Sequence, residues 1–500
     1  MNKSGFPKSK LFRLLGIAFW IALWAIAAAC VNKPLVFAGP VETVRALIEL
    51  GGTASFWHAL GITFSQILDG FFVAFLGALL LGLLADRFLF LRVILNPAMN
   101  FLKSVPVVCV IVILLLWVGS AYVAPVVVLL MVLPAYYFTI TSALADKRSE
   151  ESGVAWAAEA LRLMGVGPVR RFLSEGWAHL LPYLKATSSS VVGMAWKAGV
   201  AAQLIGLSIG TLGEQVFQAK ALIEAPVLFA LTIAIVLCAY ICEEVCLGLL
   251  VASRHIFINL ALLLPTQQSK AKGSHRKGTS FHHFSAASSD VSRFGEEPNA
   301  PLFSAEHVSV WRGKKKVLDD ISLSVPPSVV VMGASGLGKT TLCETLLGLI
   351  QPNEGCVKAP AQVGVVFQQP TLIPKLTVKE NLALVAGTKV LEDVFCGNEN
   401  TLGAKAETQS FKVLLRGIKD TQKAEELSGG QARRVELVRA LLAPTEALLL
   451  DEPFTGLDKQ IKKTALELLA EYLESTKKPL LLVSHEKTDA QSLDLNVLNL

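Results

Sequence analysis

Residues 329–341 read VVVMGASGLGKTT, and this stretch decides the fold of the second half of the chain. A strand-like apolar run, VVVM, leads directly into the pattern GxxxxGKT. In this pattern glycines let backbone N–H groups wrap phosphates at the start of a helix, the lysine reaches the β- and γ-phosphates, and the threonine suits Mg²⁺. The stretch therefore predicts an α/β P-loop domain. Its candidate phosphate-binding residues are Gly333, Ser335, Gly336, Gly338, Lys339, Thr340 and Thr341.

A second stretch, ALLLDEP at 447–453, predicts the hydrolytic half of the same site. It reads as a buried strand that ends in Asp451, which suits Mg²⁺ coordination together with Thr340. Glu452 follows directly, where a carboxylate can orient or deprotonate the attacking water. Between the two stretches lies the pentapeptide LSGGQ at 427–431, which precedes a helical run.

The order of these motifs resembles the nucleotide-binding domain of ATP-binding cassette (ABC) transporters. The resemblance extends over about 303–490 and implies ATP and Mg²⁺ as cofactors. It adds Gln368 in VVFQQP as a metal and nucleotide contact, Asp458 in FTGLD, and His485 in VSHE, which would hold the γ-phosphate and water in line. Trp311 stands where the family has an aromatic ring that stacks on adenine.

In that family two nucleotide-binding domains close on shared ATP molecules. The P-loop of one domain and the LSGGQ of the other contact the same nucleotide, so one copy of each motif implies a homodimer. The residues offered to the opposite site are Ser428, Gly429, Gly430 and Gln431. Glu452 would act as general base, and Lys339 would neutralise phosphate charge.

The first half of the chain has the composition of a membrane protein. Charged residues make up 17% of the sequence, against roughly 25% in soluble domains, and the mean hydropathy is +0.53. The net charge of +6 is dispersed, which argues against a nucleic-acid partner. Runs long enough to cross about 30 Å of hydrocarbon lie near 11–31, 61–85, 104–119, 121–144, 186–208 and 225–252.

Basic residues concentrate before the first run and in alternate loops, which predicts that both termini are cytoplasmic. This pattern indicates a multi-pass protein of the bacterial inner membrane in contact with lipid. An alternative for the first run is a cleaved signal segment, because small residues precede Cys30.

The expected fold is a membrane all-α permease with about six helices, fused to the α/β nucleotide-binding domain. The expected domains are residues 1–265, a flexible linker at 266–302 rich in Ser, Gly, Lys and His, and the ATP-binding domain at 303–500. The cytoplasmic loop at about 146–185 carries an amphipathic pattern.

That loop resembles the coupling motif of type I importers fed by binding proteins. Glu159, Ala160 and Gly165 match the motif, whereas Ala178 stands where a proline is usual. The permease half is most similar to the nitrate/sulfonate/taurine group, although Gln203 replaces the usual glutamate. The resemblance implies ATP-driven import of a sulfonate, taurine, nitrate, bicarbonate or vitamin precursor, delivered by an extracytoplasmic binding protein.

Two other functions remain open at this point. An exporter of apolar compounds would need no binding protein, and a regulatory membrane ATPase would move no solute. Lys197 also has two interpretations, because a charge within a membrane segment is costly and usually faces a partner or a polar path. It either pairs with Asp69, Glu243 or Glu244, or faces the translocation path and favours an anion.

Overall fold

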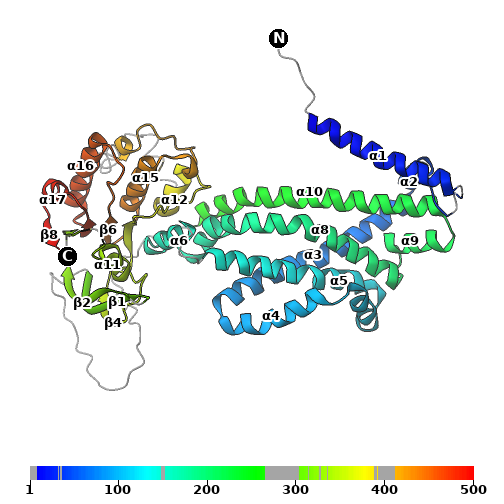
Figure 1. The fold of residues 1–500 in the computed structure, drawn as a ribbon, viewed down its shortest axis with the longest axis horizontal. Coiled ribbons are helices and arrows are strands. Elements are labelled where there is room, and N and C mark those ends of the chain that lie inside the picture. Colours follow the sequence, from blue (N-terminus) through cyan, green and yellow to red (C-terminus); the bar gives the residue numbers. More distant parts are fainter. Residues whose placement is uncertain are drawn as a thin grey trace, which may run out of the picture. The chain divides into compact units, whose positions relative to one another are not determined.

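The computed structural model describes residues 8–31, 33, 36–147, 153–264, 303–313, 315–325, 328–334, 336–387, 391 and 411–499. The chain divides into two compact units (Figure 1). The membrane unit contains Met1–Asp146 and Leu180–Ser253, and the ATPase unit contains Lys147–His179 and Arg254–Leu500. The ATPase unit thus includes most of the predicted coupling loop. The predicted linker at 266–302 lies outside the described residues.

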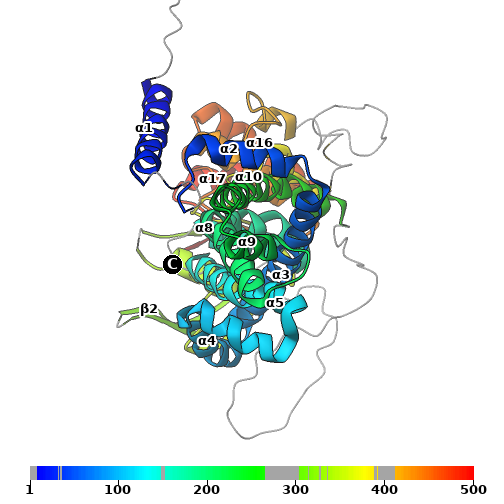
Figure 2. The same ribbon diagram turned by 90° about the vertical axis from the view of Figure 1, so that its right-hand side faces the viewer.

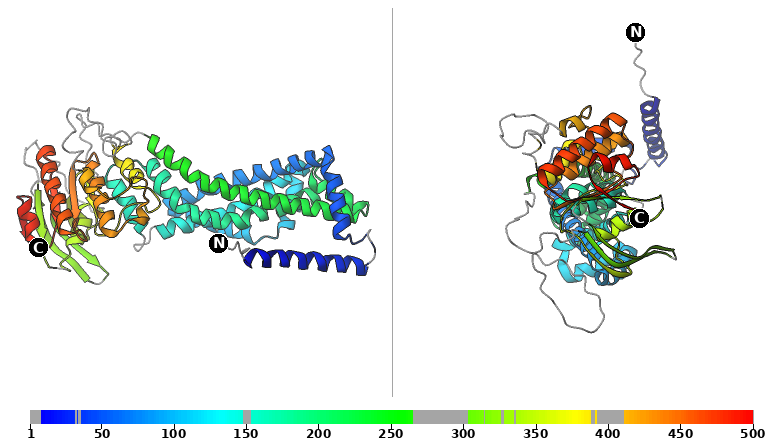
Figure 3. Two further views of the ribbon diagram at one scale, coloured as in Figure 1. Left: turned by 90° about the horizontal axis from the view of Figure 1, so that it is seen from above. Right: turned by 90° about the vertical axis from the view of Figure 1, so that its left-hand side faces the viewer.

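The membrane unit is built from helices. Long helices α3, α5, α8 and α10 run alongside one another (Figures 1 and 3), and Figure 2 looks along their length. The helices that contribute to this unit are α1 (Lys8–Val31), α2 (Pro40–Gly51), α3 (Ala54–Arg87), α4 (Leu89–Ser104), α5 (Val107–Lys147), α8 (Trp177–Gly206), α9 (Leu212–Ala221) and α10 (Ala225–Leu263).

Small residues let α3 approach α5 closely. Gly70, Ala74, Ala78 and Gly82 recur every four residues on the buried face of α3. A Cβ atom at Gly70 would lie 2.3 Å from the carbonyl oxygen of Pro125, and one at Gly82 would lie 2.7 Å from the side chain of Ile140. Such small-residue stripes are typical of membrane helices, which associate through close backbone packing.

Three of the described helices, α3, α5 and α10, are long and apolar enough to cross a membrane. The predicted third and fourth runs both fall in α5, which loses helical geometry at Gly119 (φ 74°, ψ 175°). The predicted fifth run lies in α8, and the apolar part of the first, Leu15–Val31, is shorter. The count of six spans therefore stays a prediction.

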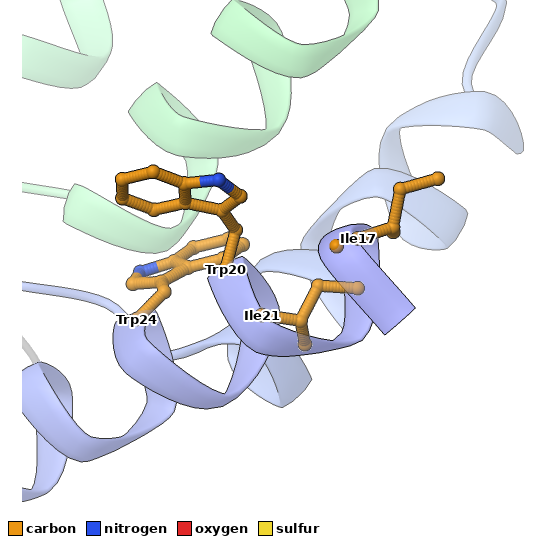
Figure 4. Close-up of a pocket in the computed structure, with 5 residues that line it drawn as sticks. Ile17, Trp20, Ile21 and Trp24 are labelled. Atoms are coloured by element: carbon orange, nitrogen blue, oxygen red, sulfur yellow. The ribbon is translucent and has the colours of Figure 1, made fainter. Parts of the chain in front are cut away.

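Helix α1 presents an apolar surface to its surroundings. Figure 4 shows Ile17, Trp20, Ile21 and Trp24 projecting from it around a shallow pocket that contains no charged side chain. Trp24 anchors the helix: its indole N–H donates to the carbonyl of Ala38 at 3.0 Å, and its ring stacks on Phe229 at 5.9 Å. An uncharged aromatic surface of this kind suits lipid chains rather than a polar ligand.

The ATPase unit contains two sheets. An antiparallel sheet has the order β2-β1-β4, formed by β1 (Phe303–Arg312), β2 (Lys315–Val325) and β4 (Glu354–Lys358). A parallel sheet has the order β5-β6-β7-β3-β8, and its inner strands are mainly apolar and buried, as is typical of a parallel sheet covered on both faces. Its strands are β3 (Ser328–Met332), β5 (Val363–Val366), β6 (Ala447–Asp451), β7 (Leu480–Val483) and β8 (Asn496–Asn499).

Helices of the ATPase unit follow these strands or precede the first of them. Figure 3, right, shows this unit in a further view. Its helical elements are α6 (Gly153–Leu163), α7 (Pro168–Arg171), η1 (Phe172–Gly176), α11 (Lys339–Leu346), α12 (Val378–Ala386), η2 (Ala424–Glu426), α15 (Gly429–Leu442), α16 (Lys459–Thr476) and α17 (Lys487–Ser492). The α/β P-loop fold expected from the sequence is confirmed.

Candidate active site

The register of the parallel sheet assembles the candidate ATP site at one edge. Val331 of β3 lies opposite Val483 of β7, and Val483 lies opposite Asp451 of β6. The carboxyl ends of these three strands are therefore level. The residues that follow them, namely the P-loop, Glu452 and His485, emerge at the same edge, where ligands bind in open parallel sheets.

The P-loop connects β3 to α11 and bends through two glycines with positive φ. Gly336 has φ 88° and Gly338 has φ 91°, a region that side chains with a Cβ rarely occupy. Lys339 is buried, and its ammonium donates to the carbonyls of Gly333 at 2.8 Å and Ala334 at 2.9 Å. Thr341 is also buried on the first turn of α11. Ser335 lies outside the described residues.

Thr340 and Asp451, the two predicted metal ligands that follow β3 and end β6, are in direct contact. The Thr340 hydroxyl donates to Asp451 Oδ2 at 3.0 Å. Asp451 is only 2% exposed, and burial raises its pKa while the bond from Thr340 works in the opposite direction. A buried carboxylate beside a hydroxyl fits the oxygen ligands that Mg²⁺ prefers. Gln368 lies apart on the exposed turn after β5, and its carbonyl accepts from Arg433 at 2.9 Å.

Glu452, predicted as the general base, and His485, predicted to hold the γ-phosphate and water, are in direct contact. Glu452 Oε1 lies 2.7 Å from His485 Nε2, and the Thr455 hydroxyl donates to Glu452 Oε2 at 3.3 Å. Glu452 has φ 49°, which is unusual for a residue with a side chain. Such backbone strain clusters at functional sites, where the surrounding structure holds it in place.

The LSGGQ residues form the start of α15. Ser428 is its N-cap and exchanges two bonds with Gln431: Gln431 N–H donates to Ser428 Oγ at 3.3 Å, and Ser428 N–H donates to Gln431 Oε1 at 2.9 Å. Gly430 is tight, because a Cβ there would lie 2.8 Å from the Gly456 carbonyl oxygen. Ser428 and Gly429 are exposed. Within the described residues, no hydrogen bond joins this motif to the P-loop of the same chain.

Asp458 and Trp311 are the remaining predicted nucleotide contacts. Asp458 is the N-cap of α16 and accepts from the backbone N–H of Ile461 at 2.8 Å. Trp311 is the penultimate residue of β1 and is 46% exposed, so its ring is available for stacking. Its backbone N–H donates to Asn353 Oδ1 at 2.8 Å, and the Lys316 ammonium lies 5.7 Å from the ring centroid.

The structure adds Lys462, for which no motif in the sequence gave a signal. Its ammonium lies 2.7 Å from Asp489 Oδ1 and 2.9 Å from Glu486 Oε1. The Ser484 hydroxyl donates to the other oxygen of Asp489 at 2.6 Å. Because Ser484 and Glu486 flank His485, this ion-paired cluster ties the histidine loop to α16.

The predicted coupling residues lie within the ATPase unit. Ala160 is fully buried in its hydrophobic core, and Glu159 forms an ion pair with Arg162 on the more exposed side of α6. Gly165 follows the helix with φ 80°. The N–H of Val166 donates to the carbonyl of Leu161 at 2.9 Å, a bond typical of a glycine-terminated helix.

The coupling segment also contacts the segment that contains Gln368. The ring of Trp156 on α6 lies 5.1 Å from the ring of Phe367. Farther along, the guanidinium of Arg170 donates to the carbonyl of Ala383 in the last turn of α12 at 2.9 Å. Burial lowers the pKa of Arg170. A cation at this place also meets the negative end of the α12 dipole.

Lys197 lies exposed on α8, beside the buried ring of Trp196. In the part of the chain that the structure describes, Lys197 makes no ion pair with Asp69, Glu243 or Glu244. The single chain therefore provides no support for the paired interpretation.

Gln203 has a physical reason to replace glutamate. It is fully buried, accepts from the Thr63 hydroxyl at 3.1 Å and donates to Gln66 Oε1 at 2.9 Å. Thr63 in turn accepts from the backbone N–H of Leu212 at 2.9 Å. An amide satisfies both neighbours without placing a charge in a buried site.

Known proteins match both halves of the chain. A family model described as "ABC transporter" matches residues 318–455, and one described as "Binding-protein-dependent transport system inner membrane component" matches residues 76–244. The chain is 37% identical over 184 residues to "Aliphatic sulfonates import ATP-binding protein SsuB 2" of Paraburkholderia xenovorans, a match that covers 36% of this chain and 69% of the relative.

Other relatives and solved structures resemble the ATPase unit. The protein "Sulfate/thiosulfate import ATP-binding protein CysA" of Escherichia coli is 36% identical over 191 residues, which cover 36% of this chain and 52% of the relative. A dimeric ATP-binding cassette bound to ADP and Pi is 26% identical with a TM-score of 0.32, covering 40% of this chain and 94% of that structure.

The two family matches fall on the two halves that the sequence separates, one on the apolar helices and one on the P-loop fold. ATP binding and hydrolysis coupled to transport follow from the ABC transporter match over residues 318–455 and from the relatives of the ATPase unit. The chain therefore belongs to the ABC transporter family, as a membrane protein in which one polypeptide joins a permease of the binding-protein-dependent type to its ATPase.

Proposed function

We propose that the protein imports a small sulfonate or related oxyanion across the bacterial inner membrane. The observation that carries the proposal is the match of the helical half to an inner membrane component of binding-protein-dependent systems, in one chain with an ABC ATPase. The relatives are named as ATP-binding proteins for the import of aliphatic sulfonates or of sulfate and thiosulfate, which supports this class of solute.

The chain would act as a homodimer with two ATP sites. Ser428 and the glycine amides at the exposed start of α15 make no bond to their own P-loop among the described residues. They are therefore available to the γ-phosphate bound by a second copy, where a helix N-terminus favours anionic groups. The intact P-loop and LSGGQ motifs of this chain favour a homodimer over a pair of different half-transporters.

In each site Lys339 would exchange its two loop carbonyls for the phosphates. Thr340 and Asp451 would hold Mg²⁺, with Gln368 approaching from the turn after β5, and the ion would offset phosphate charge. Glu452 would accept a proton from the water that attacks the γ-phosphorus, and ADP would leave as the P–O bond breaks. His485, which contacts Glu452 at 2.7 Å, would keep that water and the γ-phosphate in line.

Closure of the ATPase units would reach the membrane helices through Glu159, Ala160 and Gly165. Ala160 is packed in the ATPase core, and Trp156 contacts Phe367 beside Gln368. An extracytoplasmic binding protein would deliver the solute, and both termini would be cytoplasmic. The domain limits we propose are 1–265 for the permease, 266–302 for the linker and 303–500 for the ATPase.

Lys197 would face the translocation path and attract the anionic solute. Its exposed position on α8 and the lack of a carboxylate partner within the described residues favour this role. A Lys197→Met variant that assembles normally and loses uptake would support the assignment. A variant that fails to assemble would favour a structural role instead.

Uptake into right-side-out membrane vesicles loaded with MgATP tests the direction and the solute. The vesicles carry the full chain, and the extracytoplasmic soluble fraction of the same organism supplies the binding protein. We expect labelled taurine or methanesulfonate to accumulate only with that fraction present, and Glu452→Gln vesicles serve as the matched control. Accumulation of an apolar dye in inverted vesicles, without sulfonate uptake in either orientation, would instead establish an exporter.

A further inference from the structure

The turn that carries Gln368 is attached to α15 by a buried network of charged side chains. Three residues on one face of α15, spaced by three positions, contribute to this network: Arg433, Glu436 and Arg439. All three reach the segment 367–371, which leads away from β5. We refer to these three residues and Thr371 as the α15 clamp.

Arg433 holds the backbone on both sides of the Phe367–Gln368 peptide. Its guanidinium donates to the carbonyl of Phe367 and, at 2.9 Å, to the carbonyl of Gln368. It is also ion-paired with Glu436 at 3.2 Å. The backbone of this turn is therefore fixed, whereas the Gln368 side chain remains exposed. A guanidinium is suited to this contact because its donors lie in one rigid plane.

Thr371 is saturated by the other two clamp residues. Glu436 accepts from the Thr371 N–H at 2.5 Å and from its hydroxyl at 2.9 Å. Arg439 donates to the Thr371 carbonyl at 2.8 Å and to its hydroxyl oxygen at 2.5 Å. Thr371 and Arg439 are completely buried, and Glu436 is 2% exposed. Moving the segment away from α15 would leave several buried polar and charged groups unpaired, so the segment resists that movement.

The clamp joins parts that would serve different ATP sites. Gln368 lies on the turn that would approach the metal in the chain's own site. The same α15 begins at Ser428, which would serve the site built on the P-loop of the partner copy. Phe367, whose carbonyl Arg433 holds, also contacts Trp156 of the coupling segment.

We propose that Arg433 and Glu436 are positioning residues that make the Gln368 turn and α15 move as one body, and thereby couple the two ATP sites. This inference rests on the proposed homodimer. A shift of the turn at one site must carry Ser428 with it at the other. Occupation of one site then changes ATP affinity at the second, which is a cooperative linkage.

The test is the ATP dependence of hydrolysis by the full chain in lipid nanodiscs, with MgATP as the only ligand. We expect a wild-type Hill coefficient above 1 and up to about 2, the number of sites. Arg433→Met should bring it to about 1. Arg433→Lys should give an intermediate value, because an ammonium replaces the planar fork with a point charge.

Arg434→Met is the matched control. Arg434 is the next residue of α15, is buried whereas Arg433 is partly buried, and also donates to two carbonyls, those of Leu414 at 2.9 Å and Arg416 at 3.1 Å. It does not belong to the clamp. A general loss of stability would lower the amount of active protein in both variants and leave the Hill coefficient unchanged. Only the clamp variant is expected to change that coefficient.

Glu436→Gln provides a second measurement if Arg433→Met fails to fold. The side-chain shape is kept, and one oxygen still accepts from Thr371, but an amide N–H₂ then faces Arg433. We expect a reduced Hill coefficient in this variant as well. Wild-type cooperativity in both clamp variants would overturn the inference while leaving the homodimer intact. A wild-type coefficient of 1 would overturn the coupling outright, and sulfonate uptake in vesicles would still test the import function separately.

Discussion

Gly165 offers a direct test of how the coupling segment is held in the ATPase unit. Its φ of 80° ends α6, and an ideal Cβ would lie 2.8 Å from the side-chain amide of Gln362. In a Gly165→Ala variant the steric contact is cheap to relieve, because it involves the end of a flexible side chain. The backbone strain cannot be relieved in this way, because the left-handed conformation costs a residue with a Cβ about 1–2 kcal/mol.

This strain destabilises the local structure around α6 rather than the whole chain. A change of about 1–2 kcal/mol raises the population of locally opened molecules by about 5–30-fold. Hydrogen exchange of the amides of Met164 and Val166, which donate to Ala160 and Leu161 in the capped helix, reports this opening directly. We also expect sulfonate uptake per ATP hydrolysed to fall, while hydrolysis itself continues.

Gly167→Ala is the matched control for this experiment. Gly167 lies two residues away with φ −60° and ψ 154°, and a Cβ there would meet nothing within 4 Å. Its replacement should leave exchange and uptake unchanged. If Gly165→Ala behaves like Gly167→Ala, the left-handed conformation does not hold the coupling segment in place, and the reasoning is refuted.

Three further predictions concern the ATP site. Glu452→Gln should still bind MgATP and lose turnover by at least about 100-fold, the usual range for a general base; undiminished turnover would remove Glu452 from that role. Asp451→Asn should raise the melting temperature without nucleotide, since burial disfavours the carboxylate. Burial raises the pKa of Asp451 above its ordinary value of 3.8 in the folded state. The wild-type protein should therefore lose stability relative to Asp451→Asn as the pH rises from 3.8 through the raised pKa. Parallel dependence of the two stabilities on pH would contradict this assignment. Trp311→Ala should raise KM for ATP about fivefold at constant kcat, and Trp311→Phe should retain the wild-type KM, if the ring stacks on adenine.

Much of the ATP site was predictable because its motifs are local and strands place them. The P-loop, Asp451 and the histidine loop each follow a buried apolar strand, and a parallel sheet necessarily brings such strand ends to one edge. The contact between Glu452 and His485 follows from the same register. These residues could be paired from sequence without knowledge of side-chain packing.

The rest depends on contacts between segments far apart in sequence. Lys462 reaches Asp489 from a neighbouring helix, and Arg433 reaches carbonyl groups 65 and 66 residues earlier in the chain. Neither interaction has a periodic or compositional signal. By contrast, the break in α5 at Gly119 falls between the two predicted membrane runs, 104–119 and 121–144.

The two bonds that Lys339 donates to Gly333 and Ala334 carry a consequence for ligand choice. Any anion that enters the P-loop must replace the two hydrogen bonds that the ammonium donates to uncharged carbonyl oxygens. Inorganic phosphate makes few contacts in the P-loop, so its binding free energy hardly exceeds the cost of breaking these two hydrogen bonds. ATP adds a nucleoside and two further phosphate groups, so it offers more contacts than a small anion to offset the loss of those two hydrogen bonds.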